Sequence, residues 1–445
     1  MWKLYLFYAS MNACFQYPEI ALRIWCLNVL NLQPAAYGMV LTSAGIPWAC
    51  KPLLGALVDV NKKRRLGVFI AATFTIVPWI IIALGHVSGA FGAAFLLTLS
   101  STGLCYMDIT CDAILVTRVR DEEADKLGTL QSNCWLARAI GAVVAAIMGG
   151  VLATYAMRFG VENLLGFTGA LGLPGAIALF YETTDVEGRK FSEICVKFKR
   201  VYRTITSTAL AKPCVFIFLL CSMPNCGNTL SAFFQTALKF TSAQFAIVDV
   251  VGHCSHAVGA ALYKYKLRTV PYRTVFKWGI IISIILQALQ LLMITRVSAN
   301  AGIPDLAFAI LEAVSGSIVG QVLIMPVCVI AATRCPGGVE GTLYSAVMAI
   351  TNFGSIVGMA SGSALTAAMG VTTTNYDHMW SVALLCVAVS GVPLIFLSLI
   401  DVPPTTAEVE MTPLPEAALT ADVGPAGGTS GGFVDEPLSD TDGAE

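Results

Sequence analysis

The chain is divided into long apolar stretches that are separated by short charged or glycine-rich segments. A helix that crosses the hydrocarbon core of a bilayer needs about 20 mostly apolar residues, and a helix satisfies all of its backbone hydrogen bonds internally. Charged residues make up only 12% of this chain, whereas a soluble domain carries about 25%. The sequence therefore predicts an all-α membrane protein and excludes a soluble globular domain.

The apolar stretches predict twelve membrane-spanning helices. The first begins almost at residue 1 and continues past Pro18, so we interpret it as an uncleaved helix and not as a signal peptide. The expected spans are residues 3–29, 36–58, 66–86, 91–117, 128–156, 162–182, 212–237, 242–262, 275–296, 304–332, 342–368 and 378–400.

Basic residues divide the loops between these spans into two classes. Twenty Lys and Arg residues lie in alternate loops, whereas the opposite loops and their margins hold only Arg158, Lys239 and Arg296. Because basic loops stay in the cytoplasm, both termini are predicted to be cytoplasmic. Residues 401–445 carry ten acidic groups and no basic one, and they predict a disordered acidic tail. Nothing in this distribution indicates nucleic-acid binding.

The chain also contains an internal repeat. A Gly-Thr-Leu-x-Ser motif opens the fifth span at residue 128 and the eleventh span at residue 341. At the same offset Gly141 matches Gly354, and Gly149 matches Gly362. Equivalent features six helices apart predict two parallel six-helix halves, which is the pattern of major-facilitator transporters. The halves would be residues 1–182 and 212–400, joined by a cytoplasmic linker at 183–211.

Four charged residues are expected at similar depth in the N-terminal half. A helix rises about 1.5 Å per residue, which puts them about 9 to 15 Å from the cytoplasmic ends of their helices. A charge at this depth costs a few kcal/mol, so such residues should face a cavity or a partner. We predict that they bind substrate; the alternative is a fixed ion-pair network that only locks the helices together. They are Lys51, Asp108, Asp112 and Arg138.

Asp108 and Asp112 are four residues apart and share one helix face. Two close carboxylates in a low dielectric cannot both ionise cheaply. Either one of them is protonated, or Lys51 and Arg138 neutralise the pair. Glu19 and Arg23 form another pair at this spacing, which we interpret as mutually neutralising.

Three polar residues form a stripe on the eighth span, because Asp249, His253 and His256 are spaced by four and three. The stripe is interpreted as the lining of a polar cavity or as a proton relay, since His titrates near neutral pH. The spacing could also ligate a metal ion, but no fourth ligand is evident, so neither a metal nor a cofactor is predicted.

Several motifs occur in an order that resembles the folate–biopterin transporter family, a branch of the major facilitators. The resemblance covers roughly residues 20 to 400. Its motifs are Lys51-Pro52-Leu53…Gly55…Asp59 with the basic run 62–65, then Met107-Asp108…Asp112-Ala113, Gly128-Thr129-Leu130-Gln131-Ser132, and Cys335-Pro336…Gly341-Thr342-Leu343.

The resemblance implies the same twelve-helix fold and a role in moving folates, pterins or, in some members, other metabolites such as S-adenosylmethionine. It adds Gln131 to the predicted substrate site. A second likeness, to the general major-facilitator loop motif, implies that four residues take part in gating and do not contact substrate. These residues are Gly55, Asp59, Arg64 and Arg65.

We therefore expect a proton-coupled secondary transporter of a folate- or pterin-like anion, embedded in the lipid bilayer. A carboxylate can accept two N–H donors from a pterin edge, which suits the face of Asp108 and Asp112. Lys51 and Arg138 suit the glutamyl carboxylates of folate. Proton coupling is assigned to Asp108, Asp112, Asp249 and His253. An intramembrane enzyme is disfavoured because no nucleophile–base motif is present, and a transport-inactive receptor or scaffold is disfavoured by the midplane charges.

Overall fold

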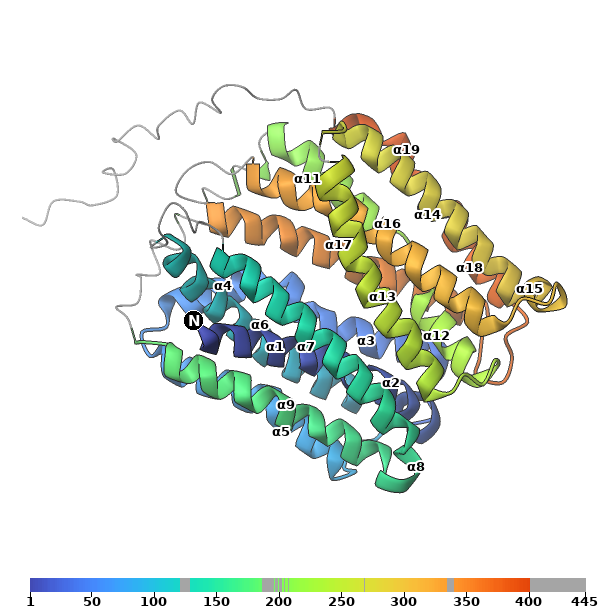
Figure 1. Cartoon of the computed structure of the whole chain (residues 1–445), viewed down its shortest axis with the longest axis horizontal. Coiled ribbons are helices and arrows are strands. Elements are labelled where there is room, and N and C mark those ends of the chain that lie inside the picture. Colours follow the sequence, from blue (N-terminus) through green and yellow to red (C-terminus); the bar gives the residue numbers. More distant parts are fainter. Residues whose placement is uncertain are drawn as a thin grey trace, which may run out of the picture. The chain divides into compact units, whose positions relative to one another are not determined.

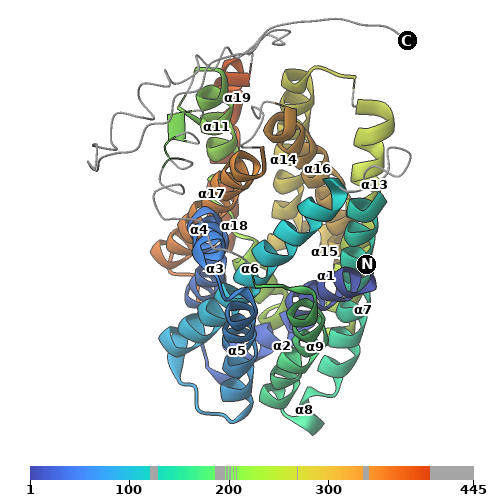
Figure 2. The ribbon, with the colours of Figure 1, turned by 90° about the vertical axis from the view of Figure 1, so that its left-hand side faces the viewer.

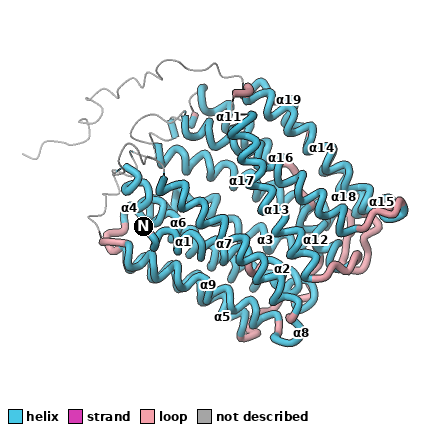
Figure 3. The backbone as a smooth tube through the Cα atoms, viewed as in Figure 1, coloured by secondary structure: helices cyan, strands magenta, loops and turns pink. Residues whose placement is uncertain are grey.

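The computed structural model describes residues 1–120, 129–185, 208–267, 269–333 and 340–400, and within 186–207 it describes only 196, 199, 202, 203, 205 and 206. Within these ranges every regular element is a helix (Figures 1 and 3). The predicted tail lies outside the described residues, as does most of the predicted linker. The side chain of Gln131 also lies outside them, although its backbone belongs to a helix.

The N-terminal half contains the elements from α1 to α9. They are α1 (Trp2–Gln16), α2 (Glu19–Ile24), the π-helix η1 (Trp25–Val29), α3 (Pro34–Ala49), α4 (Lys51–Val60), α5 (Arg64–Ala83), α6 (Gly89–Arg120), α7 (Thr129–Thr154), α8 (Ala156–Phe159) and α9 (Val161–Glu182).

The C-terminal half contains the elements from α11 onward. They are α11 (Thr208–Cys221), α12 (Gly227–Thr236), α13 (Ser242–Leu262), the π-helix η3 (Tyr263–Leu267), α14 (Tyr272–Ile294), α15 (Val297–Asn300), α16 (Asp305–Thr333), α17 (Glu340–Ala368), α18 (Met379–Ser390), α19 (Val392–Ile395) and the 3-10 helix η4 (Leu397–Ile400).

Eight helices in the described ranges are individually long and apolar enough to cross a membrane: α5, α6, α7, α9, α13, α14, α16 and α17. The other four expected spans correspond to broken helices, so the described helices are compatible with the predicted twelve spans. The single helices expected at 3–29, 36–58, 212–237 and 378–400 are each interrupted, at Pro18, at Cys50 before Pro52, around Pro224, and at Gly391 before Pro393. A proline lies within or just after each break, and it weakens a helix because it lacks a backbone donor and clashes with the preceding turn.

The repeated glycines have the same role in both halves. A Cβ atom added at Gly141 or Gly149 of α7 would collide with the backbone of the first span, at Ala9 or Tyr17. In the other half, a Cβ atom at Gly362 of α17 would collide with the carbonyl of Asn225 in the seventh span. One at Gly354 would lie 2.8 Å from the Cβ of Cys221. In each half the fifth helix therefore packs closely on the first, as two copies of one unit would.

The two halves meet through a small number of helices. Helix α3 packs against α17, and α7 packs against α13. Within the halves, α1 lies between α7 and α9, while α13 packs along α16 (Figure 2). Ile20 and Ala153 of the N-terminal half share an apolar cluster with Phe233, Phe245 and other residues of the C-terminal half. The first span therefore reaches the boundary between the halves.

Substituting Gly141 by Val should destabilise the protein. The new side chain meets the backbone of α1, and overpacking of this kind costs about 1–3 kcal/mol. The melting temperature in detergent should fall by several degrees. The matched control is Gly316→Val in α16, where a Cβ atom would meet nothing within 4 Å. Equal melting temperatures for the two variants would contradict the close packing of α1 on α7.

Candidate functional site

The four charges predicted at similar depth are in contact, and we call them the charge cluster: Lys51, Asp108, Asp112 and Arg138. Lys51 opens α4 at the break after α3, which turns its side chain toward α6. Its Nζ donates to Asp108 Oδ2 at 2.7 Å and to Asp112 Oδ2 at 3.1 Å. Arg138 of α7 donates from Nη2 to Asp108 Oδ1 at 3.2 Å. The cluster therefore ties three helices of one half together.

The two carboxylates of the cluster differ in exposure. The side chain of Asp108 is only 1% exposed, and both of its oxygens accept hydrogen bonds from cations. The side chain of Asp112 is 41% exposed. Two cations contact the two carboxylates, so Lys51 and Arg138 are placed to neutralise the pair. Asp108 is enclosed by this balance, and Asp112 is the accessible end of the cluster.

Uncharged residues of α1 complete the cluster. The hydroxyl of Tyr8 donates to Asp112 Oδ1 at 2.6 Å, and the guanidinium carbon of Arg138 lies 5.3 Å from the centre of the Tyr8 ring. Asn12 Nδ2 donates to the backbone carbonyl of Arg138 at 2.9 Å. Sequence reasoning missed both residues because a Tyr or Asn within an apolar helix is ordinary. Their spacing of four residues, which puts them on one face of α1, was the available signal.

The predicted stripe on α13 lies in the C-terminal half. His253 contacts the first span, with its Nε2 atom 2.8 Å from Gln16 Oε1. The His253 and His256 ring centres lie 6.3 Å apart. Asp249 precedes His253 by one turn on α13, and this helix contacts α2. Across the described residues, no three His, Cys, Asp or Glu side chains gather in a way that could hold a metal ion.

Three of the four predicted gating residues, Asp59, Arg64 and Arg65, lie at the junction of α4 and α5, and Gly55 lies within α4. Arg64 Nη2 lies 4.0 Å from Asp59 Oδ1, at the outer limit of an ion pair. Arg65 Nε donates to the carbonyl of Thr183 at 2.8 Å, and its backbone N–H donates to Asp185 Oδ1 at 3.0 Å. These contacts fasten the start of α5 to the end of α9. Gly55 faces α6, where a Cβ atom would lie 3.9 Å from a methyl group of Ile109.

Comparison with known families identifies the chain. The model of the BT1 family matches residues 15–412, which is most of the sequence. The chain belongs to the BT1 family. A folate-biopterin transporter of Synechocystis is 28% identical over 388 residues, covering 86% of this chain and 78% of that protein. Folate transporter 1 of Plasmodium falciparum is 23% identical over 401 residues, covering 87% and 78%.

Solved transporter structures share the fold of this BT1-family chain. The nucleoside transporter NupG superposes with a TM-score of 0.69 at 14% identity, covering 90% of this chain and 98% of that one. A POT family transporter in complex with 5-aminolevulinic acid superposes with a TM-score of 0.65 at 12% identity, covering 90% and 96%. At such identities the likeness shows the fold alone, which is that of the major facilitators.

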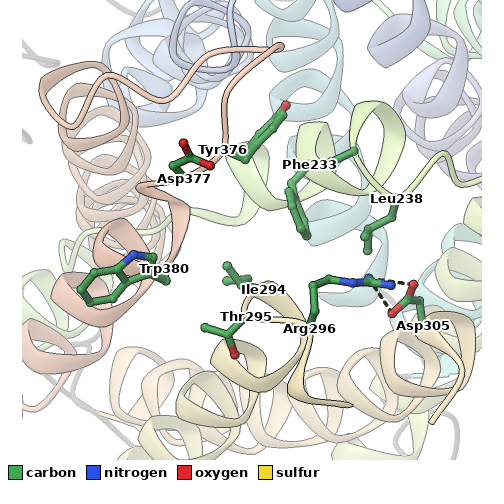
Figure 4. Close-up of a pocket in the computed structure, with 10 residues that line it drawn as sticks. Phe233, Leu238, Ile294, Thr295, Arg296, Asp305, Tyr376, Asp377 and Trp380 are labelled. Atoms are coloured by element: carbon green, nitrogen blue, oxygen red, sulfur yellow. Dashed lines mark hydrogen bonds and ion pairs between the residues drawn. The ribbon is translucent and has the colours of Figure 1, made fainter. Parts of the chain in front are cut away.

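A separate cavity of about 550 Å³ lies in the C-terminal half of the BT1-family chain, beside α15 (Figure 4). Arg296 points toward Asp305, and its Nη1 atom is 2.9 Å from both carboxylate oxygens. Tyr376, Asp377 and Trp380 lie on the other side of the opening. None of the predicted substrate-binding, proton-coupling or gating residues lines this cavity, so it is distinct from the charge cluster.

The Asp108→Asn substitution should destabilise the protein. It leaves two cations of the charge cluster facing one carboxylate, and removing one partner of a buried ion pair costs about 3–5 kcal/mol. Adding Arg138→Gln should restore part of the stability, since it removes the stranded charge. The melting temperatures of the two single variants and the double variant form a thermodynamic cycle that measures this coupling. Additive effects, or an Asp108→Asn variant as stable as the unmodified protein, would contradict it.

Proposed function

We propose that this BT1-family chain is a secondary transporter that carries folate, biopterin or a related pteridine by alternating access. The observation that carries the proposal is the accessible carboxylate of Asp112 in a charge-balanced cluster inside the membrane. The names of the relatives, a folate-biopterin transporter and a folate transporter, support the same substrate class. In this fold substrates are expected to bind near the bilayer midplane, where charged side chains are kept for function.

Asp112 has the chemistry to recognise a pteridine. The amino-pyrimidine edge of a pteridine presents adjacent N–H donors, and a carboxylate can accept two of them side by side. Tyr8 and Lys51 already donate to Asp112 and hold it in one orientation. Asp108 in turn fixes Lys51. The buried part of the cluster therefore positions its exposed end, and we assign Gln131 and Arg138 to the same site.

Alternating access requires the halves to separate, and the contacts between them suit that requirement. They include single neutral hydrogen bonds, such as Asn352 Nδ2 to the carbonyl of Trp48 at 3.2 Å and the backbone N–H of Thr373 to Gln33 Oε1 at 3.0 Å. A net hydrogen bond of this kind contributes about 1 kcal/mol, so such contacts can break and re-form. The residues at the α4–α5 junction would act as the gate at that end of the helix bundle.

We place that junction and both termini in the cytoplasm. Of the described basic residues, Lys62 to Arg65 lie at the α4 end of the bundle, whereas Arg158 and Arg296 lie at the α8 and α15 end (Figure 1). The basic end is the cytoplasmic one by the positive-inside rule. A C-terminal tag that external protease removes from intact cells would overturn this orientation.

Cells that need an external pteridine should accumulate labelled folate or biopterin when they make this protein, and Asp112→Asn should reduce uptake about 10- to 100-fold. Asn retains one acceptor oxygen but loses the charge-assisted bidentate contact, which is roughly twice as strong as a neutral one. Because Asp112 is partly exposed, the melting temperature should change much less than for Asp108→Asn. If the unmodified protein takes up neither compound, the proposed substrate class is wrong. That result is expected of a transport-inactive receptor or of a carrier of S-adenosylmethionine.

Uptake should also depend on a proton gradient. We assign coupling to Asp108, Asp112, Asp249 and His253, because carboxylates and imidazole are the groups here that can exchange a proton. The measurement is accumulation in proteoliposomes when the pH gradient is collapsed at constant membrane potential. The internal concentration of substrate should then rise only to the external concentration. Undiminished accumulation would show that protons do not drive transport.

A further inference from the structure

Arg23 of α2 is a buried cation whose hydrogen bonds are incomplete. The residue is only 3% exposed, and among the described residues its Nε and Nη1 atoms have no hydrogen-bond partner. Tyr37 of α3 also interacts with the guanidinium, but its hydroxyl is neutral and leaves these two atoms unsatisfied. Glu19, one turn earlier, approaches Nη2 only to 3.7 Å, which is an ion-pair distance but too long for a hydrogen bond. Glu19 therefore forms the predicted ion pair with Arg23, but it leaves Nε and Nη1 of the guanidinium without a hydrogen-bond acceptor.

The guanidinium lies at the boundary between the two halves. Its carbon is 4.1 Å from the centre of the Phe245 ring, which belongs to α13 of the C-terminal half. Asp249 follows Phe245 by one turn on the same helix face, and its charge acts on Arg23. Two turns on, His253 meets Gln16. The first span and α13 thus face each other through two polar pairs, Arg23 with Asp249 and Gln16 with His253. These pairs lie on the surface where the halves must separate during transport.

This arrangement is costly unless a ligand uses it. A guanidinium carries five N–H donors, and a buried donor without a partner costs free energy. The face of Phe245 offsets part of the charge, but it supplies no hydrogen-bond acceptor along the edge of the guanidinium. In the charge cluster, by contrast, Lys51 and Arg138 have carboxylate partners within hydrogen-bond distance, at 2.7 Å and 3.2 Å. Arg23 is therefore the better-prepared partner for an incoming anion.

We propose that Arg23 binds a carboxylate of the substrate when α13 moves away from α2, and that it selects folates over pterins. The inference rests on the proposed function and deepens it. Folate has a pteridine at one end and glutamyl carboxylates at the other, whereas biopterin has no carboxylate. A guanidinium is suited to carboxylates because its donors form charge-assisted pairs with both oxygens.

The position of Arg23 fits the far end of an elongated substrate. Tyr8, which contacts Asp112, and Arg23 are fifteen residues apart on the first span, which would be about 22 Å along an unbroken helix and is at most that across the break at Pro18. A pteridine alone cannot extend from one to the other. An extended pteridine–aminobenzoyl–glutamate approaches that length, so Asp112 and Arg23 can hold its two ends. In the described conformation Phe245 occupies the space in front of the guanidinium, and the substrate's carboxylate takes its place as the halves separate.

The test compares two halves of folate as probes of the purified full-length protein. Biopterin carries the pteridine without a carboxylate, and p-aminobenzoyl-glutamate carries the carboxylates without the pteridine. Binding is measured calorimetrically for the unmodified protein, Arg23→Gln, Arg23→Lys and the control Arg158→Gln, which replaces an exposed arginine of α8. Uptake of folate and biopterin is measured in the same set.

Arg23→Gln should weaken binding of p-aminobenzoyl-glutamate and folate about tenfold or more, as expected when a charged hydrogen-bond partner is removed. Biopterin binding should stay within about twofold, Arg23→Lys should fall between, and Arg158→Gln should resemble the unmodified protein. Equal weakening for folate and biopterin would show a structural role and overturn the proposal, as would unchanged binding of both. An unmodified protein that carries biopterin but not folate would overturn the Arg23 inference alone. One that carries neither would overturn the proposed function, and this inference with it.

Discussion

The cost of placing charge in a low dielectric controls the N-terminal half of this protein. Asp108 is almost completely enclosed, and a carboxylate at that depth is tolerable only with its charge balanced and its oxygens hydrogen-bonded. Lys51 and Arg138 meet both conditions, and they do so from two further helices. The positions of α4, α6 and α7 are therefore linked, and α1 joins them through Tyr8 and Asn12. The close approach of α1 to α7 at Gly141 and Gly149 allows those contacts to form.

The sequence was sufficient to predict the fold class and the charge cluster, because both follow from strong physical penalties. Apolar length sets the number of spans, and the rise per residue puts Lys51, Asp108, Asp112 and Arg138 at one depth without knowledge of their contacts. The helix breaks could not be predicted in the same way. Pro78 and Pro174 lie inside continuous helices, whereas Pro18 marks a break, and only the neighbouring helices decide which outcome holds.

The contacts of uncharged polar residues were also beyond sequence reasoning. Tyr8 and Gln16 lie on one helix, yet Tyr8 meets a carboxylate of its own half and Gln16 meets His253 of the other. Placing a Tyr or Gln in a membrane helix costs too little free energy to require a polar partner. The presence of such a residue in the sequence therefore says little about its contacts. Arg23 illustrates the opposite case. Its spacing from Glu19 suggested an adequate partner, but the 3.7 Å separation leaves its donors unsatisfied.

The stronger polar interactions lie within each half, and the weaker ones lie between the halves, as alternating access requires. The ion pairs between described residues each join two members of one half, whether in the charge cluster or between Arg296 and Asp305. The described polar contacts across the boundary, by contrast, include single neutral hydrogen bonds and the approach of Arg23 to Phe245. Breaking a buried ion pair costs several kcal/mol, whereas a neutral hydrogen bond contributes about 1 kcal/mol. Each half can therefore move as a unit, and an anion that satisfies Arg23 can compensate for the hydrogen bonds that break when the halves separate.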